Sequence, residues 1–439
     1  MTYNSDKAEA AASEALKHTT APQPGRLLGM LLRFRTFEAL RYREYRLLWY
    51  GQVFASMGTW MDEVARGWLI YELTNSAVQL GLVRGIQAIP LLLLSPVAGS
   101  AADRYSRKTQ VVAAQVVSGL VYAATALLIF TGQIKPWHVY VNAFLMAVVQ
   151  TFIQPARTAM ISDAVPLPCL TNAIGLSAMV FNVSRSTGPA LAGILIAVLG
   201  TGSSYFAQAV FFFLATLWTL QLRADQRSSA RADGPLPHRE SFRQSIIEGW
   251  KLSWRKEEIR VGLLTVMIVS LFIAPFTTLL PVFARDVLGV GAEGQGLLLT
   301  AMGIGALCSS VLIASAGDRL PRGMLMLGSV ALYGFIVVIF AASTWFQLSL
   351  VMMWITGLCT VHSHALVQTV IQSYSPSEFR GRTMAIFNMS QVVMTVGSML
   401  IGTLSSLLGA RWAVASLGTI GALTMIAIYI TLPRARLIR

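Results

Sequence analysis

Charged residues are scarce in this sequence, and their scarcity excludes an ordinary soluble protein. Asp, Glu, Lys and Arg make up 12% of the 439 residues, whereas soluble domains contain about 25%. Hydrophobic residues make up 55%. A chain of this composition is typical of proteins that cross a membrane several times.

Cysteine is scarce too, and the usual signatures of nucleotide or metal chemistry are missing. The three cysteines, Cys169, Cys308 and Cys359, lie in or beside apolar segments and form neither a disulfide framework nor a metal-ligand set. The nucleotide-binding pattern G-x-x-x-x-G-K-[ST] is absent, which argues against ATP-driven work by this chain. We therefore expect no metal and no cofactor.

Acidic residues are outnumbered by basic ones. The chain has 34 Lys and Arg against 20 Asp and Glu, which gives a formal net charge of +14. The basic residues do not gather on one soluble module but lie in short stretches between apolar runs, a distribution that indicates membrane topology. We therefore expect membrane lipid, and no nucleic acid, among the partners.

Long apolar runs are what the sequence does contain. A helix needs about 20 apolar residues to cross a bilayer. Segments of that kind predict an all-α integral membrane protein with twelve transmembrane helices, at residues 46–72, 78–101, 109–131, 137–163, 170–199, 203–222, 260–284, 294–315, 324–343, 346–372, 382–408 and 411–432.

The loops divide these spans into two halves. The one long, charged connection, residues 223–259, follows the sixth span, and part of it predicts an amphipathic helix lying on the membrane surface. The predicted domains are a cytoplasmic tail with an amphipathic segment (1–45), a six-helix half (46–222), this linker, a second six-helix half (260–432) and a short cytoplasmic tail (433–439).

The positions of Lys and Arg predict the orientation. Twenty-seven of the 34 lie in, or at the margins of, the segments on one side of the predicted membrane, and three lie in loops on the other side. Basic residues favour the cytoplasmic side. We therefore expect both termini in the cytoplasm of a cell whose inner membrane holds the protein.

The sequence repeats itself at about half its length. Residues 77–108 align without gaps on residues 292–323, with an offset of 215, so that a D-R-x-x-R pattern recurs in the same inter-helix loop. A second match, with an offset near 210, pairs Gly188 and Gly193 with Gly397 and Gly402. Such internal repeats are typical of transporters whose substrate site lies between two pseudo-symmetric halves.

The loop after the second span, GSAADRYSRK, resembles the signature loop G-x-x-x-D-R-x-x-R-[KR] of the major facilitator superfamily. The stretches QPARTAMISD and RSTGPALAG more narrowly resemble the enterobactin-exporter-like branch of multidrug and siderophore exporters. The resemblance implies a latch between the halves that breaks when the inner side opens; the alternative is a charged turn that only fixes topology. The latch residues are Gly99, Asp103, Arg104, Arg107 and Lys108, with Asp318, Arg319 and Arg322 in the second copy.

A second motif lies in the fifth span. The stretch SRSTGPALAG resembles the superfamily's antiporter motif, with Gly188, Pro189 and Gly193 in place and Arg185 preceding them. Small residues at this spacing permit close helix contact. The resemblance implies that this contact restricts ion leak and favours export by antiport; ordinary small-residue packing is the alternative.

Ionisable groups inside spans cost free energy, so each is a functional candidate. Arg84 has no counterpart in the repeat, because the matching position is Leu299. It either faces the cavity, where it would favour an anionic substrate group, or pairs with Glu63 or Asp62. Arg157, near the inner end of the fourth span, is expected to have a structural role, because it could reach the membrane interface and pair there, six residues before Asp163. In this superfamily the first, fourth, seventh and tenth spans line the cavity, and the resemblance implies the same here. Further polar candidates on the fourth and tenth spans are Gln150, Gln154 and His364.

The first span carries a polar stripe. At 100° per residue, five polar residues fall within an arc of about 80°: Gln52, Ser56, Thr59, Glu63 and Arg66. Asp62 lies at its edge, one turn before Arg66, at the spacing of an i,i+4 ion pair. We hypothesise that Asp62 holds Arg66, while Glu63, favoured in its protonated form away from water, binds the coupling proton or a cationic substrate group. The alternative is that Glu63 is solvated near the outer surface.

These patterns predict a monomeric secondary transporter that binds a small molecule and protons and exports amphipathic compounds by proton-coupled alternating access. Uptake of a small organic anion, which Arg66 and Arg84 could serve, is an alternative. An enzyme is disfavoured, because His362 and His364 lack nearby acidic companions. A non-transporting sensor is disfavoured for want of a sizeable soluble output domain.

Overall fold

The computed structural model describes residues 35–223, 250–251, 253–316, 322–376 and 379–432, and within them it is helical. The first group of helices consists of η1 (Arg35–Arg41), α3 (Arg43–Thr74), α4 (Ala77–Arg104), α5 (Arg107–Phe130), α6 (Pro136–Asp163), α7 (Leu167–Leu199) and α8 (Thr201–Leu220).

The second group follows the linker. Its helices are α10 (Glu257–Ile268), continued by η2 (Val269–Ile273), η3 (Ala274–Leu279), α11 (Leu280–Val282) and η4 (Phe283–Val287); α12 (Gly291–Ala316); α13 (Arg322–Ala342); α14 (Phe346–Val361), continued by η6 (His362–Leu366) and α15 (Val367–Tyr374); α16 (Arg380–Asn388) with α17 (Ser390–Leu408); and α18 (Ala410–Thr431).

These elements confirm the twelve predicted spans, with ends that agree within about three residues. Within the described residues, eleven helices are long and apolar enough to cross a membrane. The one remaining predicted span is the first in the sequence, α3, which has 32 residues but carries Asp62, Glu63 and Arg66 in its interior. Its charges, not its length, distinguish it from the others.

The seventh span is not one regular helix. Between Val269 and Val287 it passes through π and 3₁₀ turns, with Pro275 and Pro281 in the irregular stretch. Proline has no backbone N–H to donate and clashes with the preceding turn, so it breaks helical hydrogen bonding. Polar residues in this stretch, Thr277 and Thr278, consequently lie on a distorted segment of the span.

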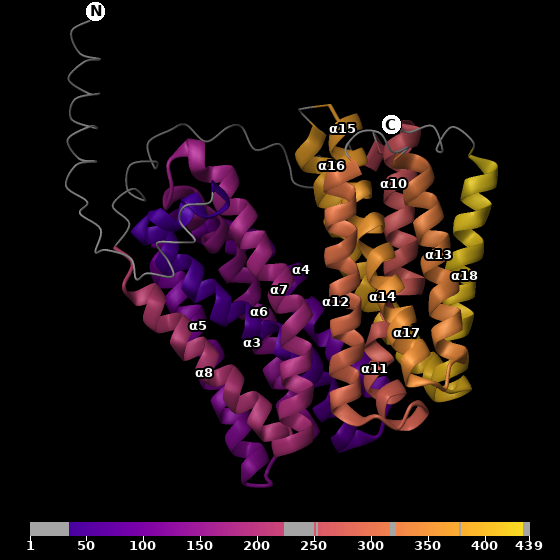
Figure 1. Cartoon of the computed structure of the whole chain (residues 1–439), viewed down its shortest axis with the longest axis horizontal. Helices are drawn as coiled ribbons and strands as arrows, with labels where there is room; N and C mark the ends of the chain where they lie inside the picture. The colour runs from indigo at the N-terminus through magenta and orange to yellow at the C-terminus, as the bar shows by residue number, and fades with distance from the viewer. Residues whose placement is uncertain (1–34, 224–249, 252, 317–321, 377–378, 433–439) are drawn as a thin grey trace, which may run out of the picture.

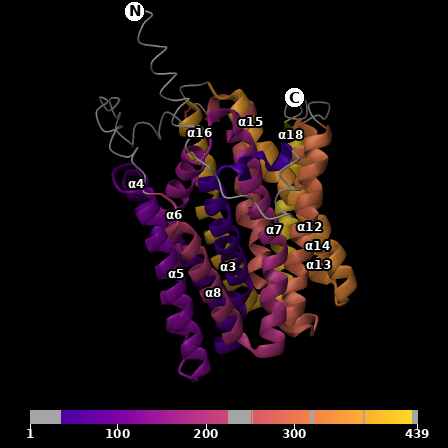
Figure 2. The same ribbon diagram turned by 60° about the vertical axis from the view of Figure 1, so that its left-hand side comes forward.

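The two groups of helices lie beside each other (Figure 1). Their ribbons diverge toward the end of the bundle where α10 begins and converge toward the other end. The turned view places α4, α5 and α6 on one side and α12, α13 and α14 on the opposite side (Figure 2). By the predicted orientation, the divergent end is cytoplasmic and the convergent end is external.

Glycines at equivalent places in the repeat form the contacts between the groups. A Cβ on Gly81 of α4 would lie 2.7 Å from the carbonyl oxygen of Ser398 on α17. A Cβ on Gly296 of α12 would lie 2.5 Å from the carbonyl oxygen of Pro189 on α7. Gly81 and Gly296 correspond under the 215-residue offset, so the same contact is built twice.

The second pair of motif glycines completes this symmetry. A Cβ on Gly402 would lie 2.7 Å from the carbonyl oxygen of Ala77, and one on Gly193 would lie 2.6 Å from that of Ala292. Ala77 and Ala292 are themselves one offset apart. The internal repeat of the sequence is therefore a pseudo-twofold relation in space, with two backbone-to-backbone seams, α4 with α17 and α7 with α12.

The predicted amphipathic helix in 223–259 lies largely outside the described residues. Within its described end, Trp250 and Trp254 are 50% and 53% exposed, and their rings stack with centroids 5.9 Å apart. The tail 1–45 is described only from Arg35, where η1 packs on α7 through the bond from the Ala39 N–H to Asn172. The domain boundaries remain predictions.

Candidate functional site

A cavity of about 650 Å³ lies between the two groups of helices. Residues of α3, α4, α5, α6 and α7 line it from the first group, and Gln391, Met394, Thr395 and Ser398 of α17 line it from the second. Its walls are mixed, with apolar side chains such as Leu91, Met146 and Phe181 beside charged and amide groups. A volume of this order suits a small organic molecule.

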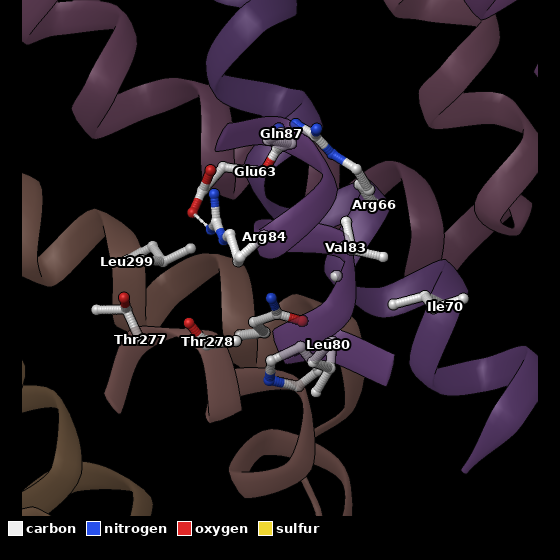
Figure 3. A pocket seen from close by; sticks show the side chains of 13 residues that line it. Glu63, Arg66, Ile70, Leu80, Val83, Arg84, Gln87, Thr277, Thr278 and Leu299 are labelled. Carbon is white, nitrogen blue, oxygen red and sulfur yellow. Dashed lines mark hydrogen bonds and ion pairs between the residues drawn. The ribbon is translucent and has the colours of Figure 1, made fainter. Parts of the chain in front are cut away.

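The first charged pair of the cavity lies within α3. Arg66 donates to the Asp62 carboxylate, and the two side chains are only 9% and 3% exposed. The Gln87 amide lies against the same guanidinium (Figure 3), and with its oxygen turned inward it accepts from both terminal nitrogens of Arg66. The i,i+4 spacing predicted this pair, and burial among helices makes each charge depend on the other.

The second pair joins two helices. Arg84 of α4 donates to the Glu63 carboxylate of α3, and the side chains are 28% and 27% exposed (Figure 3). Arg84 therefore pairs with Glu63 and also lines the cavity. Its preference for an anionic substrate group stays a prediction. Glu63 is not an unpaired acid, because the packing of α4 on α3 brings this arginine to it.

Beyond these pairs lies a small chamber of about 20 Å³, which has room for a single water molecule. Glu63, Arg84 and Gln87 form one wall of it (Figure 3). Thr277 and Thr278, from the irregular seventh span, lie on the other side of it (Figure 3), and the buried Gln295 also lines it. The ion pairs therefore stand between the large cavity and a narrow polar chamber.

The convergent end of the protein is closed past this chamber. The Tyr71 hydroxyl of α3 donates to the Asp286 carboxylate of η4, and the Arg285 guanidinium lies 5.3 Å from the centre of the Tyr71 ring. Pro281 also packs closely on Gly67, since a Cβ on Gly67 would lie 3.3 Å from the Cγ of Pro281. These contacts and the glycine seams join the two groups at the predicted external end.

Widening one seam should open this end. Gly193→Val places a branched side chain against the Ala292 carbonyl, and overpacking of this kind costs about 1–3 kcal/mol. The reporter is a single thiol introduced by Thr278→Cys, at a position that is 5% exposed, in a protein from which Cys169, Cys308 and Cys359 have been removed. We expect Gly193→Val to make this thiol react several-fold faster with a membrane-impermeant maleimide added outside.

The control for this change is Gly175→Val on the same helix, because nothing lies within 4 Å of a Cβ at Gly175. Unchanged labelling in the Gly193→Val protein would contradict the assignment of the seam to the external closure.

An aromatic wall with a cation beside it forms another part of the cavity. Trp60 and Phe181 both line it, and their rings meet edge to face with centroids 5.3 Å apart. The Arg185 guanidinium lies 5.6 Å from the centre of the Trp60 ring, within cation–π range. Gly188 makes this arrangement possible, since a Cβ there would lie 2.8 Å from the Cβ of Trp60.

The remaining polar candidates fall into two sets. Gln150 and Gln154 line the cavity, and Gln150 Nε2 donates to the Thr59 hydroxyl over 3.4 Å. Gln52 does not line it: its amide donates to the Ser177 carbonyl oxygen on α7 over 3.0 Å, in a structural contact between α3 and α7. His364 lies on η6 against the Phe387 ring at 5.9 Å, also away from the cavity lining.

The signature loop shows contacts within its own half. Arg107 pairs with Asp163 at the end of α6, and Lys108 donates to the carbonyl oxygens of Leu220, the last residue of α8, and of Leu222 just after it. Asp318 and Arg319 lie outside the described residues, as do the surroundings of Gly99 and the side chains of Asp103 and Arg104. Arg322 begins α13. The role of the latch stays a prediction.

Two contributions to the site were missed in the sequence. Gln87, one turn along α4 from Arg84, contacts Arg66, and its spacing of three residues from Arg84 was a usable signal. The residues of α17 were also missed, because the seventh and tenth spans were expected to supply the second half of the lining. Gln391, Thr395 and Ser398 recur at helical spacing, which would have revealed a polar face on α17.

Comparisons with known proteins agree over most of the chain. A family described as "Transmembrane secretion effector" matches residues 35–437. The chain is 26% identical over 362 residues to the Staphyloferrin A transporter of Staphylococcus aureus, which covers 80% of this chain and 87% of that protein. It is 25% identical over 376 residues to the multidrug efflux pump Tap of Mycobacterium tuberculosis, covering 83% and 87%.

Solved structures share the fold at low sequence identity. A bacterial homologue of the human lysosomal transporter Spinster, in an inward-facing and unoccupied conformation, superposes with a TM-score of 0.65 at 15% identity, covering 90% of this chain and 95% of that one. The peptide transporter POT gives a TM-score of 0.69 at 12% identity, with coverage of 90% and 95%.

Proposed function

This chain belongs to the transmembrane secretion effector family of the major facilitator superfamily, and from that premise we propose that it exports a small amphipathic molecule in exchange for protons. It is a multi-pass membrane transporter and not an enzyme. The observation that carries the proposal is the position of the two ion pairs, between a ligand-sized cavity and the closed external end.

The shape of the cavity supports loading from the cytoplasm. Ser95, Gln154 and Gln391 line it and are exposed, and each lies toward the divergent end of its helix. At the convergent end, the Tyr71–Asp286 bond and the glycine seams hold the groups together. With the predicted orientation, this is an inward-open state, ready to take a substrate from inside the cell through the inner membrane.

The Glu63–Arg84 pair supports coupling to protons. The pair links α3 to α4 and borders both the large cavity and the small polar chamber. A proton on Glu63 would remove its negative charge and release Arg84, so the same group can alternate between holding a proton and holding an arginine. Multidrug efflux, named for one of the relatives above, and transport of Staphyloferrin A, named for the other, are both compatible with this exchange.

Reconstituted transport tests the proposal. We expect purified protein in liposomes to move at least one compound from a panel of siderophores, drugs and organic acids, with substrate movement accompanied by opposite proton flux. A liposome interior more acidic than the outside should drive substrate inward against its concentration gradient, as protons leave. Proton movement in the same direction as substrate would favour uptake of an organic anion instead, and absence of any substrate-dependent flux would contradict coupled transport.

A further inference from the structure

The charges around the cavity do not balance. Two acids and two arginines line it, and they neutralise one another in pairs. Two further arginines, Arg157 and Arg185, lie within about one helical turn of lining residues on α6 and α7, and they form no ion pair with any residue in the described part of the chain. The site therefore carries an excess of two positive charges in a region where uncompensated charge is costly.

Arg185 supplies the deeper of these charges. It lies one helical turn after Phe181 on α7, over the Trp60 ring. Glu63 and His364 are close enough to interact with it electrostatically, but Glu63 is already bound to Arg84. A guanidinium beside two aromatic rings offers a charged contact and an apolar contact to the same ligand.

Arg157 supplies the second charge, nearer to the mouth. On α6 it lies seven residues after Gln150, which places it about 20° away from Gln150 around the helix. Gln150 and Gln154 both line the cavity, and Arg157 follows on that face one turn closer to the divergent end. An entering solute would therefore pass Arg157 before it reaches Arg185.

We propose that the cavity selects organic acids, with a carboxylate held by Arg185 and an aromatic or other apolar body lying on Trp60 and Phe181. Arg157 attracts the anion at the mouth. This inference rests on the proposed transport function and specifies its substrate class. Guanidinium groups bind carboxylates through paired, charge-assisted hydrogen bonds, which a neutral or cationic solute cannot form.

A cationic substrate fits these walls poorly. The acids that could bind it, Asp62 and Glu63, are each occupied by an arginine. Binding a cation would mean displacing one of those arginines and leaving it without a partner, at a cost of several kcal/mol for a buried charge. An organic acid needs no such rearrangement, because its partners are already free.

Two dyes with a common xanthene core provide the test: fluorescein, which is anionic, and rhodamine 123, which is cationic. The full chain is placed in nanodiscs of neutral phosphatidylcholine, and binding is followed by fluorescence anisotropy at neutral pH against empty nanodiscs. We expect fluorescein to bind about tenfold more tightly than rhodamine 123, the scale of one charge-assisted hydrogen bond. Equal binding, tighter binding of rhodamine 123 or no binding of fluorescein would overturn the proposal.

Variants assign the effect to the two arginines. Arg185→Gln should weaken fluorescein binding about tenfold without weakening rhodamine 123, Arg185→Lys should retain the preference for the anion, and Arg157→Gln should weaken fluorescein several-fold. Arg43→Gln makes the same change of charge in an exposed pair and should alter neither dye. Equal loss of both dyes in Arg185→Gln and Arg157→Gln would mark a structural role and overturn the proposal.

Equilibrium binding of the dyes needs neither turnover nor a proton gradient, so its result does not depend on the result of the transport assay. Preference for fluorescein without any substrate-dependent flux would count against the proposed function alone. Coupled export of cations with no preference for fluorescein would count against the substrate class alone.

Discussion

Asp62→Leu is expected to destabilise the protein by about 3–5 kcal/mol, the usual cost of removing one partner from a buried ion pair. The substitution leaves the Arg66 guanidinium with Gln87 but without its carboxylate, in a place where its side chain is only 9% exposed. Thermal unfolding of the purified protein, followed by tryptophan fluorescence in one fixed detergent, measures the loss.

The double variant Asp62→Leu, Arg66→Met should recover most of this loss. Replacing both members of a buried pair with apolar groups of similar volume is often neutral or stabilising, because no charge remains to be desolvated. Arg43→Met, which removes one member of the exposed Arg43–Glu44 pair, should change stability by less than about 1 kcal/mol. A double variant less stable than Asp62→Leu would show that the pair does more than neutralise charge.

The fold could be predicted because the bilayer limits it. A helix that crosses a membrane must be apolar over a nearly fixed length, so the spans can be counted from hydropathy. The repeat then predicts two equivalent halves, and the structure shows that Gly81 and Gly296, at equivalent positions of the repeat, make equivalent contacts. The Asp62–Arg66 pair was predictable for a similar reason, since both partners lie on one helix with a known period.

The rest of the site depends on how helices are rotated and shifted against one another. Arg84 could be assigned either to the cavity or to Glu63 from the sequence, and only the height of α4 beside α3 brings it to both. The meeting of Arg185 with Trp60 depends in the same way on α7 packing closely against α3 at Gly188. Hydropathy patterns carry no information about such offsets.

The prediction that the seventh and tenth spans supply lining residues shows the same limit. That expectation came from a family resemblance, whereas the lining of the large cavity from the second half comes from α17. Thr277 and Thr278 contribute to the small chamber instead, because the irregular turns of the seventh span bring them against α4. Helix number alone does not determine which face meets the cavity.

Glu63→Gln is expected to separate substrate movement from proton movement. Glutamine resembles protonated glutamate in size and charge, so Arg84 would be released permanently and no proton could be exchanged at this position. Exchange of substrate across liposomes without a gradient should persist, within about tenfold of the unaltered protein. Accumulation driven by a pH gradient should be abolished.

Glu72→Gln is the matched control, because it makes the same change on α3 nine residues further along, where Glu72 only accepts a hydrogen bond from Thr201 over 2.8 Å. It should leave gradient-driven accumulation unchanged. Full proton coupling in the Glu63→Gln protein would remove Glu63 from the coupling mechanism and leave Asp62, the buried acid of α3, as the next candidate.

Exposure favours Glu63 over Asp62 for this role. A coupling acid must exchange its proton with water in at least one state of the transport cycle. The Glu63 side chain is 27% exposed and borders both the cavity and the chamber, whereas the Asp62 side chain is 3% exposed.

Asp62 shares its helix with its partner, so motion between α3 and α4 does not separate that pair. Glu63 and Arg84 lie on different helices, and a shift between those helices changes their distance directly. The two pairs thus combine one fixed charge with one that the conformational change can break.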